Sequence, residues 1–392
     1  MSFPAIVIVT YNRAYSLQRL LRSISRANFA GHTDVPLIIS IDKSNCQEVL
    51  EVARKFQWEH GPKCVIEHTE HLGLRKHIIS CGDLTEEYGA VIVLEDDLYV
   101  SPVFYDYAVQ AMRFYDGDER ISGISLYSYD FNEYAQMRFC PLDDGYDNYF
   151  IQNASSWGQL WTRAQWVDFK QWYISQSQLT VRQEDPLPTS VIRWSESSWK
   201  KYFIKYMVLR NKYFVYPRVS LSTNFGDIGT HARVGSTRCQ VPLALRRKVY
   251  DFSRLEDSIS VYDSYFEIAA HCLKYYNQDL VHVDFESDFY GTKDLGKVKT
   301  EYLLSIRECT QPILSYSIDF VPQELSVILS CEGKFFHLAK VGDFGELKQD
   351  KRHFQLRHLH KNLGLRSYGF LFLMGLSERV GDNFRSKKVV SK

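Results

Sequence analysis

Short apolar runs alternate with amphipathic helical patterns through the first third of the chain. Runs rich in Val and Ile occupy residues 5–10, 35–41, 65–66, 90–94 and 121–126. Between them, apolar residues recur at the three- and four-residue spacing of a helix that buries one face. Parallel strands that are covered on both faces have such near-continuous apolar sequences. The alternation therefore predicts an α/β fold, with a mostly parallel, Rossmann-like sheet and helices on both of its faces.

The rest of the chain is harder to assign. Ser44 and Gln47 have the spacing of a capping box, which predicts a helix start there. Strand patterns thin out over residues 127–240, and from 241 onward the pattern is mixed. We expect three parts: a ligand-binding and catalytic domain over 1–240, a smaller α/β or helical accessory region over 241–350, and a tail over 351–392.

Charge and cysteine content exclude several classes of protein. The 47 Lys and Arg residues balance 47 Asp and Glu residues, whereas a dedicated nucleic-acid binder needs a basic surplus. The eight cysteines are scattered without a CxxC pair, which argues against a structural zinc site or a disulfide framework. The first residues lack the pattern of a signal peptide, so we expect a cytoplasmic protein with reduced thiols.

An acidic triplet follows the fourth apolar run directly. Glu95, Asp96 and Asp97 come after 90–94, and ligands of open α/β sheets bind at the carboxyl ends of strands. Three adjacent carboxylates repel one another unless a cation joins them, and Mg²⁺ or Mn²⁺ is held by one or two carboxylates plus substrate phosphates. An acidic turn after a buried strand is the alternative. The motifs GxGxxG, GxxxxGK[ST] and HExxH are absent from the sequence, which argues against dinucleotide oxidoreductases and P-loop enzymes.

Several segments resemble nucleotide-sugar glycosyltransferases of the GT-A fold, and in particular the N-acetylglucosaminyltransferase I family. The resemblance covers roughly residues 3–235 and is absent from 241 onward. The segments are VIVTYNR (7–13), IVLEDDLYVSPVFYDYA (92–108), ISGISLYSYDFN (121–132), SSWGQLWTRAQW (155–166), RWSESSW (193–199) and NFGDIGTHA (224–232).

The resemblance implies roles for individual residues. Asp97 matches a direct ligand of Mn²⁺ or Mg²⁺, and His231 could complete the metal shell. Residues that match or line the donor site are Thr10, Asn12, Arg13, Asp42, Arg75, Glu95 and Asp96. Asp42 matches a carboxylate that binds uracil, and a helix-capping or turn aspartate is its alternative. For Arg75 the alternative is a solvated helix face.

The same resemblance implies a catalytic base and an acceptor platform. The family places its base immediately before a tryptophan, but Ser197 and Ser198 precede Trp199 here. We therefore expect Glu196 to be the base, with Asp130, Asp144 and Asp185 as substitutes. Six of the seven tryptophans lie between 157 and 199. Most should be core residues, and we expect Trp157 and Trp194 to contact the acceptor, because aromatic faces match the apolar faces of sugar rings.

These expectations describe an inverting, metal-dependent glycosyltransferase. It would move a sugar from a nucleoside diphosphate, UDP being expected, to a hydroxyl of a glycan or lipid-linked acceptor in surface polysaccharide synthesis. A nucleotidyltransferase and a non-catalytic sugar-binding domain of the same fold are the alternatives. Residues 351–392 carry ten Lys and Arg against two acids, around an apolar stretch at 368–376. This tail could lie on an anionic membrane at the inner face of the plasma membrane, or dock as a helix, or end the chain in disorder.

Overall fold

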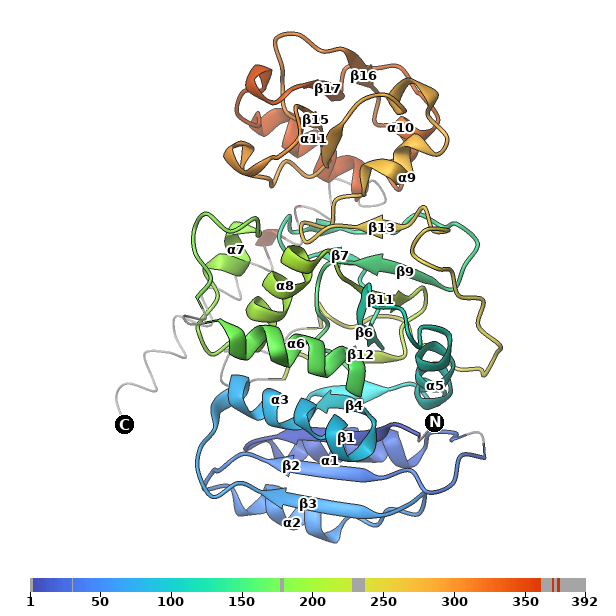
Figure 1. Cartoon of the computed structure of the whole chain (residues 1–392), viewed down its shortest axis with the longest axis vertical. Helices are drawn as coiled ribbons and strands as arrows, with labels where there is room; N and C mark the ends of the chain where they lie inside the picture. The colour runs from blue at the N-terminus through green and yellow to red at the C-terminus, as the bar shows by residue number, and fades with distance from the viewer. Residues whose placement is uncertain are drawn as a thin grey trace.

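A computed structural model describes residues 3–29, 31–176, 180–227, 237–360, 369, 372 and 373. Its centre is a sheet of nine strands (Figure 1). Five of the eight neighbouring pairs in this sheet are parallel, and the three pairs β9–β11, β6–β10 and β10–β4 are antiparallel. In spatial order the strands are β13 (Val261–Tyr262), β9 (Asn148–Ile151), β11 (Tyr213–Pro217), β6 (Ile121–Ser125), β10 (Gln159–Thr162), β4 (Ala90–Glu95), β1 (Ala5–Thr10), β2 (Leu37–Ile41) and β3 (Lys63–Glu67). The predicted α/β fold with a mostly parallel sheet is confirmed.

Amphipathic helices cover this sheet. Helix α3 (Gly73–Asp83) packs on β1 and β4, whereas α6 (Arg163–Ser175) packs on β6 and β10. Helix α8 (Trp199–Arg210) contacts both of these helices, and all three lie in front of the sheet in Figure 1. The other helices of this part are α1 (Ala14–Ser25), α2 (Gln47–Lys55), α4 (Thr85–Tyr88), α5 (Phe104–Phe114) and α7 (Thr189–Ile192).

Two short antiparallel pairs lie beside the large sheet. Strand β5 (Leu98–Val100) pairs with β12 (Ser222–Asn224), and this pairing brings residues 222–227 to the segment that follows the acidic triplet. Strands β7 (Phe131–Asn132) and β8 (Met137–Arg138) form a small hairpin.

A second sheet of four strands forms from residues beyond 280 (Figure 1). Its spatial order is β14 (Phe285–Asp288), β15 (Tyr302–Ser305), β17 (Phe336–Lys340) and β16 (Leu314–Tyr316). Short helices accompany it: α9 (Ala270–Lys274), η1 (Gln278–Leu280), η2 (Leu295–Lys297), α10 (Leu325–Ile328) and η3 (Val341–Asp343). The proposed domain limits at 240 and 350 stay predictions, and the large sheet includes β13, which lies beyond 240.

Helix α11 (Gln349–Leu359) joins the second sheet to the small hairpin. Arg352 donates to the carbonyls of Tyr290 and Ala135, and Gln355 donates to the carbonyl of Phe289 at 2.5 Å. The first residues of the basic tail are thus docked on the body. In the apolar stretch at 368–376 the structure describes residues 369, 372 and 373 only.

Helix α2 begins at Gln47, as expected, but it does not begin with the expected capping box. Ser44 and Gln47 do not form a capping box, because Cys46 is the N-cap of α2 and makes no side-chain capping bond. The hydroxyl of Ser44 instead accepts the N–H of Cys46 at 3.2 Å and donates to the carbonyl of Tyr11 at 3.0 Å. Residues 127–240 contribute β9, β10 and β11 to the large sheet, although their strand pattern is weak.

Four of the clustered tryptophans are core residues, as expected. Trp161, Trp166, Trp172 and Trp199 are at most 6% exposed. The Trp161 ring packs on Trp166 at 4.8 Å and on Trp199 at 5.5 Å between ring centroids. Within the described part of the chain, no helix is long and apolar enough to cross a membrane. The eight cysteines, all in that part, form no disulfide.

Candidate active site

A cavity of about 910 Å³ opens at the carboxyl ends of β1, β2 and β4. The parallel pairing of these strands brings Thr10, Asp42 and the triplet to one edge of the sheet. Further lining comes from residues within 71–77, 127–136, 224–227 and 238–239, and from Trp157 and Ser197. The strand-end rule therefore places the predicted acidic residues around one hollow.

Arg13 ties the first strand to the acidic triplet. Its guanidinium donates to Asp97 Oδ2 at 3.2 Å and also to Asp96 Oδ1. The hydroxyl of Thr10 donates to the other oxygen of Asp96 at 2.8 Å. Asp96 is 2% exposed, so these bonds hold a buried carboxylate between β1 and β4. Asn12 also lines the cavity.

Burial disfavours the charged forms of two carboxyl groups in the triplet. Burial, with the charges of Asp97 and Asp96, raises the pKa of Glu95 to about 8. Burial likewise raises the pKa of Asp96 to about 6, against the opposing effect of Arg13. The triplet thus concentrates more negative charge than one guanidinium offsets, and such a site favours an added cation.

One oxygen of the triplet fits a metal ligand. Asp97 Oδ1 is buried and has no hydrogen-bond partner among the described residues. A buried carboxylate oxygen without a partner carries a free-energy cost that a bound cation would remove. No group of three or more His, Cys, Asp or Glu side chains with metal-site geometry occurs among the described residues. A metal held here would therefore need ligands from a bound substrate, as Mg²⁺ commonly does.

Asp42 has a structural role that is visible in its contacts. Its carboxylate accepts the N–H of Leu72 at 2.7 Å and that of Gly73 at 3.0 Å, at the start of α3. It also accepts the N–H of Lys43, and His71 Nδ1 lies 3.0 Å from it. The helix-capping alternative for Asp42 is therefore realised. Asp42 also lines the cavity, so the uracil contact stays a prediction.

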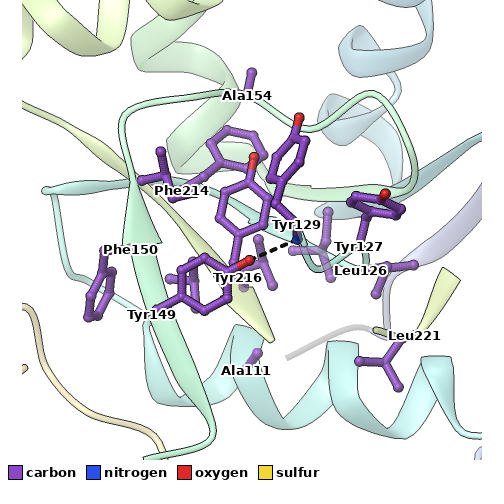
Figure 2. Close-up of a cluster of buried hydrophobic side chains, with 14 of the residues drawn as sticks. Ala111, Leu126, Tyr127, Tyr129, Tyr149, Phe150, Ala154, Phe214, Tyr216 and Leu221 are labelled. Carbon is purple, nitrogen blue, oxygen red and sulfur yellow. Dashed lines mark hydrogen bonds between the residues drawn. The ribbon is translucent and has the colours of Figure 1, made fainter. Parts of the chain in front are cut away.

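Aromatic side chains form another part of the lining. Tyr127 and Tyr129 contact Trp157, with ring centroids 4.6 Å and 5.8 Å away. Both tyrosines lie in the buried cluster drawn in Figure 2, where the hydroxyl of Tyr149 accepts the N–H of Tyr129 at 2.9 Å. The Tyr149 side chain on β9 thus holds the backbone at Tyr129, the N–H of Tyr127 donates to Ser125, and both rings line the cavity.

A carboxylate and an ammonium group stand beside this aromatic wall. Glu133 follows β7 and is 26% exposed, and Lys200 in the first turn of α8 is 9% exposed at its side chain. Lys200 Nζ donates to Glu133 Oε1 at 2.9 Å, and the Tyr129 hydroxyl donates to the same oxygen at 3.0 Å. Burial raises the pKa of Glu133, but the charge of Lys200 and hydrogen bonds outweigh it, so the net pKa is lowered. Glu133 is therefore ionised at neutral pH.

The segment after β12 is anchored on α1. Asp227 lines the cavity and accepts from Ser16 at 2.7 Å and from Arg19. The Arg19 guanidinium also lies 3.9 Å from the centroid of the Phe225 ring. This contact fixes residues 225–227 next to the triplet. His231 falls outside the described residues, so its predicted metal role has no geometry here.

Other predicted residues do not line the cavity. Arg75 lies 5.0 Å from the centroid of the Tyr202 ring. Glu196 is 66% exposed at its side chain, and it pairs with Lys201 and accepts from Tyr202. Trp194 is half-buried against Lys200, outside the lining. The substitute bases also lie elsewhere: Asp130 is exposed, Asp144 pairs with Arg218, and Asp185 pairs with Lys205.

The sequence analysis missed several residues of the cavity. Tyr127 and Tyr129 stand in the segment 121–132 that carries the resemblance, and Glu133 is the next residue. Lys200 follows Trp199 directly, and Asp227 lies within 224–232. Tyr127 directly follows the predicted strand at 121–126 and could have been found from that strand end, whereas no strand end marked Glu133, Lys200 or Asp227.

Comparison with protein families finds a match for the first part of the chain. Residues 5–164 match the family model described as Glycosyl transferase family 2. Residues 5–164 are therefore similar to a glycosyl transferase family 2 domain. This region spans β1 to β10 and so includes the triplet, Arg13, Asp42 and Glu133. The match supports the recognised resemblance to glycosyltransferases of the GT-A fold.

A curated relative agrees with this assignment. Over 247 residues the chain is 22% identical to an alpha-1,3-mannosyl-glycoprotein 2-beta-N-acetylglucosaminyltransferase of Arabidopsis thaliana. The matched region is 59% of this chain and 48% of the relative, so the match spans about half the length of that protein.

Solved structures with partial similarity include a mannosyltransferase and a protein named TarS. One is the mannosyltransferase PcManGT from Pyrobaculum calidifontis in complex with GDP-Man and Mn²⁺, with 10% identity and a TM-score of 0.33 over 44% of this chain and 46% of that one. The other is S. aureus TarS 1-349, with 14% identity and a TM-score of 0.35 over 56% and 59%. These low scores do not support any inference of shared ligands.

Proposed function

We propose that the chain is a metal-dependent, inverting glycosyltransferase whose donor is a nucleoside diphosphate sugar, with UDP as the nucleotide. The observation that carries the proposal is the acidic edge of the cavity within the region that is similar to a glycosyl transferase family 2 domain. There Arg13, Asp96 and Asp97 converge, and Asp97 Oδ1 lacks a partner in the described structure. The acceptor would be a hydroxyl of a glycan or of a lipid-linked glycan, in surface polysaccharide synthesis.

Different residues of the cavity would bind different parts of the donor. The donor site would be lined by Thr10, Asn12, Arg13, Glu95 and Asp96. The uracil ring would bind to the side of Asp42 that faces the cavity. Arg75 could pair with the diphosphate only by leaving the Tyr202 ring. Bound Mn²⁺ or Mg²⁺, held by Asp97 and in the proposal also by His231, would supply positive charge to the leaving diphosphate.

The acceptor side has a different composition. Trp157 and the two tyrosines next to it offer flat apolar faces of the kind that stack on pyranose rings. Trp194 stays a proposed acceptor contact, and its ring packs against Lys200 next to the cavity. The resemblance implies Glu196 as the base, but its carboxylate is paired with Lys201 and Tyr202 and does not line the cavity.

Calorimetric titration of UDP, with and without Mn²⁺, tests the proposal. Wild type should bind UDP at least tenfold more tightly with Mn²⁺, and Asp97→Asn should lose that gain, because the neutral amide is a poor ligand of a hard cation. Asp116→Asn, in an exposed turn after α5, is the matched control. Mn²⁺-independent UDP binding, or an Asp97→Asn variant that keeps the gain, would contradict the metal role. Release of UDP from a panel of UDP-sugars would then identify the sugar.

The basic tail supports one further element of the proposal, which is peripheral association with an anionic membrane. Residues 361–392 carry seven Lys and Arg against two acids, and each basic residue near an anionic surface contributes about 1 kcal/mol. A lipid-linked acceptor would be reached at such a surface.

A further inference from the structure

Six carboxylates line the cavity in the described structure, and five of them already have an assignment. Asp42 caps α3, Asp96 and Asp97 bind Arg13, and Asp227 binds Arg19. Glu95 belongs to the triplet, beside these charges. Glu133 is the remaining carboxylate, and it reaches the cavity from the β7–β8 hairpin rather than from a strand end of the triplet.

An inverting sugar transfer requires a base on the side of the cavity away from the diphosphate site. In an inverting displacement the acceptor attacks the anomeric carbon from the side opposite the leaving diphosphate. The base must therefore stand apart from the groups that hold the diphosphate. Glu133 satisfies this condition because it belongs to the β7–β8 hairpin and not to the strand ends that carry the triplet. It lies beside Tyr129 and Trp157, on which a sugar ring could stack.

The surroundings of Glu133 also hold it in place. Lys200 and the Tyr129 hydroxyl both donate to Oε1, and Lys200 Nζ lies 3.1 Å from the Tyr129 hydroxyl, which closes a triangle of contacts. Tyr129 is itself fixed through its N–H by Tyr149 (Figure 2). Lys200 lies 5.9 Å from the centroid of the Trp157 ring. A carboxylate held in this way offers a proton acceptor of defined position, as a base requires.

We propose that Glu133 is the general base of this enzyme and that Lys200 positions it. The inference rests on the function proposed above. As the acceptor oxygen bonds to the anomeric carbon, its proton moves to the Glu133 carboxylate. The bond from that carbon to the diphosphate oxygen breaks, and the diphosphate leaves with the electron pair. Water can replace the acceptor hydroxyl in the same step, so donor hydrolysis reports on the same base.

The first test compares Glu133→Gln with wild type in the full-length chain. The probe is UDP-N-acetylglucosamine with Mn²⁺ and water as acceptor, or whichever UDP-sugar gives the fastest wild-type release of UDP. Glu133→Gln should lower kcat at least 100-fold and change the Kd of UDP less than threefold, because the base acts in the transition state. Glu133→Asp should recover part of the rate. Glu51→Gln, on the exposed face of α2, is the matched control.

Three results would overturn the inference. A Glu133→Gln variant with at least a third of the wild-type kcat would do so, as would loss of UDP binding in that variant. A 100-fold loss in Glu196→Gln with normal turnover in Glu133→Gln would transfer the role to Glu196. Failure of the wild type to bind UDP with Mn²⁺ would instead refute the proposed function, and it is measured separately by titration.

A second test uses the pH profile, which a merely structural role would not move. Lys200→Met removes the charge that lowers the pKa of Glu133, so the acid limb of the kcat profile should shift to higher pH. The charged or titratable side chains that act on this carboxylate, or on which it acts, are Lys200, Tyr127, Tyr129, Tyr134, Tyr216 and Cys239. Lys200 is the one cation among them. An acid limb at the wild-type position in Lys200→Met would argue against Glu133 as the titrating base.

Discussion

His77 offers a quantitative test of how the cavity floor is built. It lies on α3, is 3% exposed, and its Nε2 is 2.8 Å from the hydroxyl of Ser40 on β2. The ring of His68 stands 5.2 Å from it, and His68 also contacts Ser40 at 3.1 Å. Burial lowers the pKa of His77 to about 4, with Asp42 opposing and His68 and His71 adding to the effect. The folded state therefore holds this imidazole neutral.

The sign and size of the effect on stability follow from linkage. The unfolded chain binds a proton at His77 near the ordinary pKa of about 6.5, while the folded chain does not. This stabilisation of the folded state is complete above that pKa and is lost as the pH falls from about 6.5 toward 4. Between pH 7 and pH 5 the free energy of unfolding should fall by about 2 kcal/mol through this group alone.

Urea unfolding of wild type and His77→Gln at both pH values isolates the effect. Other groups titrate in both proteins, so the difference between the two pH-dependent losses belongs to His77. Wild type should lose about 2 kcal/mol more than the variant on going from pH 7 to pH 5. His282→Gln, at an exposed position, is the control and should lose as much as wild type. Equal losses in wild type and His77→Gln would refute the idea that a neutral, buried His77 supports the fold.

Three further predictions concern separate parts of the molecule. Asp42→Ala removes the acceptor of the Leu72 and Gly73 amides, so the free energy of unfolding should fall by about 2 kcal/mol, and by less in Asp42→Asn. Unchanged urea midpoints would contradict the capping role. In Gly82→Ala the new methyl group would clash with the Trp166 ring, and calorimetry should show a loss of about 1–3 kcal/mol, whereas Gly342→Ala meets nothing nearby and is the control. Deletion of residues 361–392 keeps α11 and should preserve UDP binding while weakening sedimentation with anionic vesicles. Equal sedimentation with the full-length chain would argue against a membrane role of the tail.

The elements that the sequence predicted best are those whose burial is complete. The runs that became β1 and β4 are apolar except at their last residues, because both faces of these strands are buried. Strand β9 reads NYFI and β10 reads QLWT, so polar and aromatic residues break the apolar pattern. Asn148 is fully buried, and it is satisfied by Ser253 at 2.8 Å, a residue 105 positions away. Such long-range compensation leaves no local pattern in the sequence.

The candidate site also has residues that the sequence predicted and residues that it did not. The triplet and Arg13 follow strand ends, and the topology of a parallel sheet alone brings strand ends together. Glu133 has no such guide, because its hairpin is placed by contacts from distant segments. One of these is the bond from Arg352 on α11 to the carbonyl of Ala135. A side chain that depends on a contact 217 positions away cannot be placed from its neighbours in the sequence.

The position expected for the base has a different use in this chain. The residue before Trp199 is Ser198, and its hydroxyl accepts the N–H of Lys201 as the N-cap of α8. That cap begins the helix whose first turn holds Lys200 against Glu133. The position before Trp199, where the resemblance would place an acid, therefore holds the helix cap Ser198. The helix that begins there directs the Lys200 ammonium group toward Glu133 of another segment. If Glu133 is the base, the carboxylate on the acceptor side of the cavity comes from the β7–β8 hairpin rather than from the start of α8.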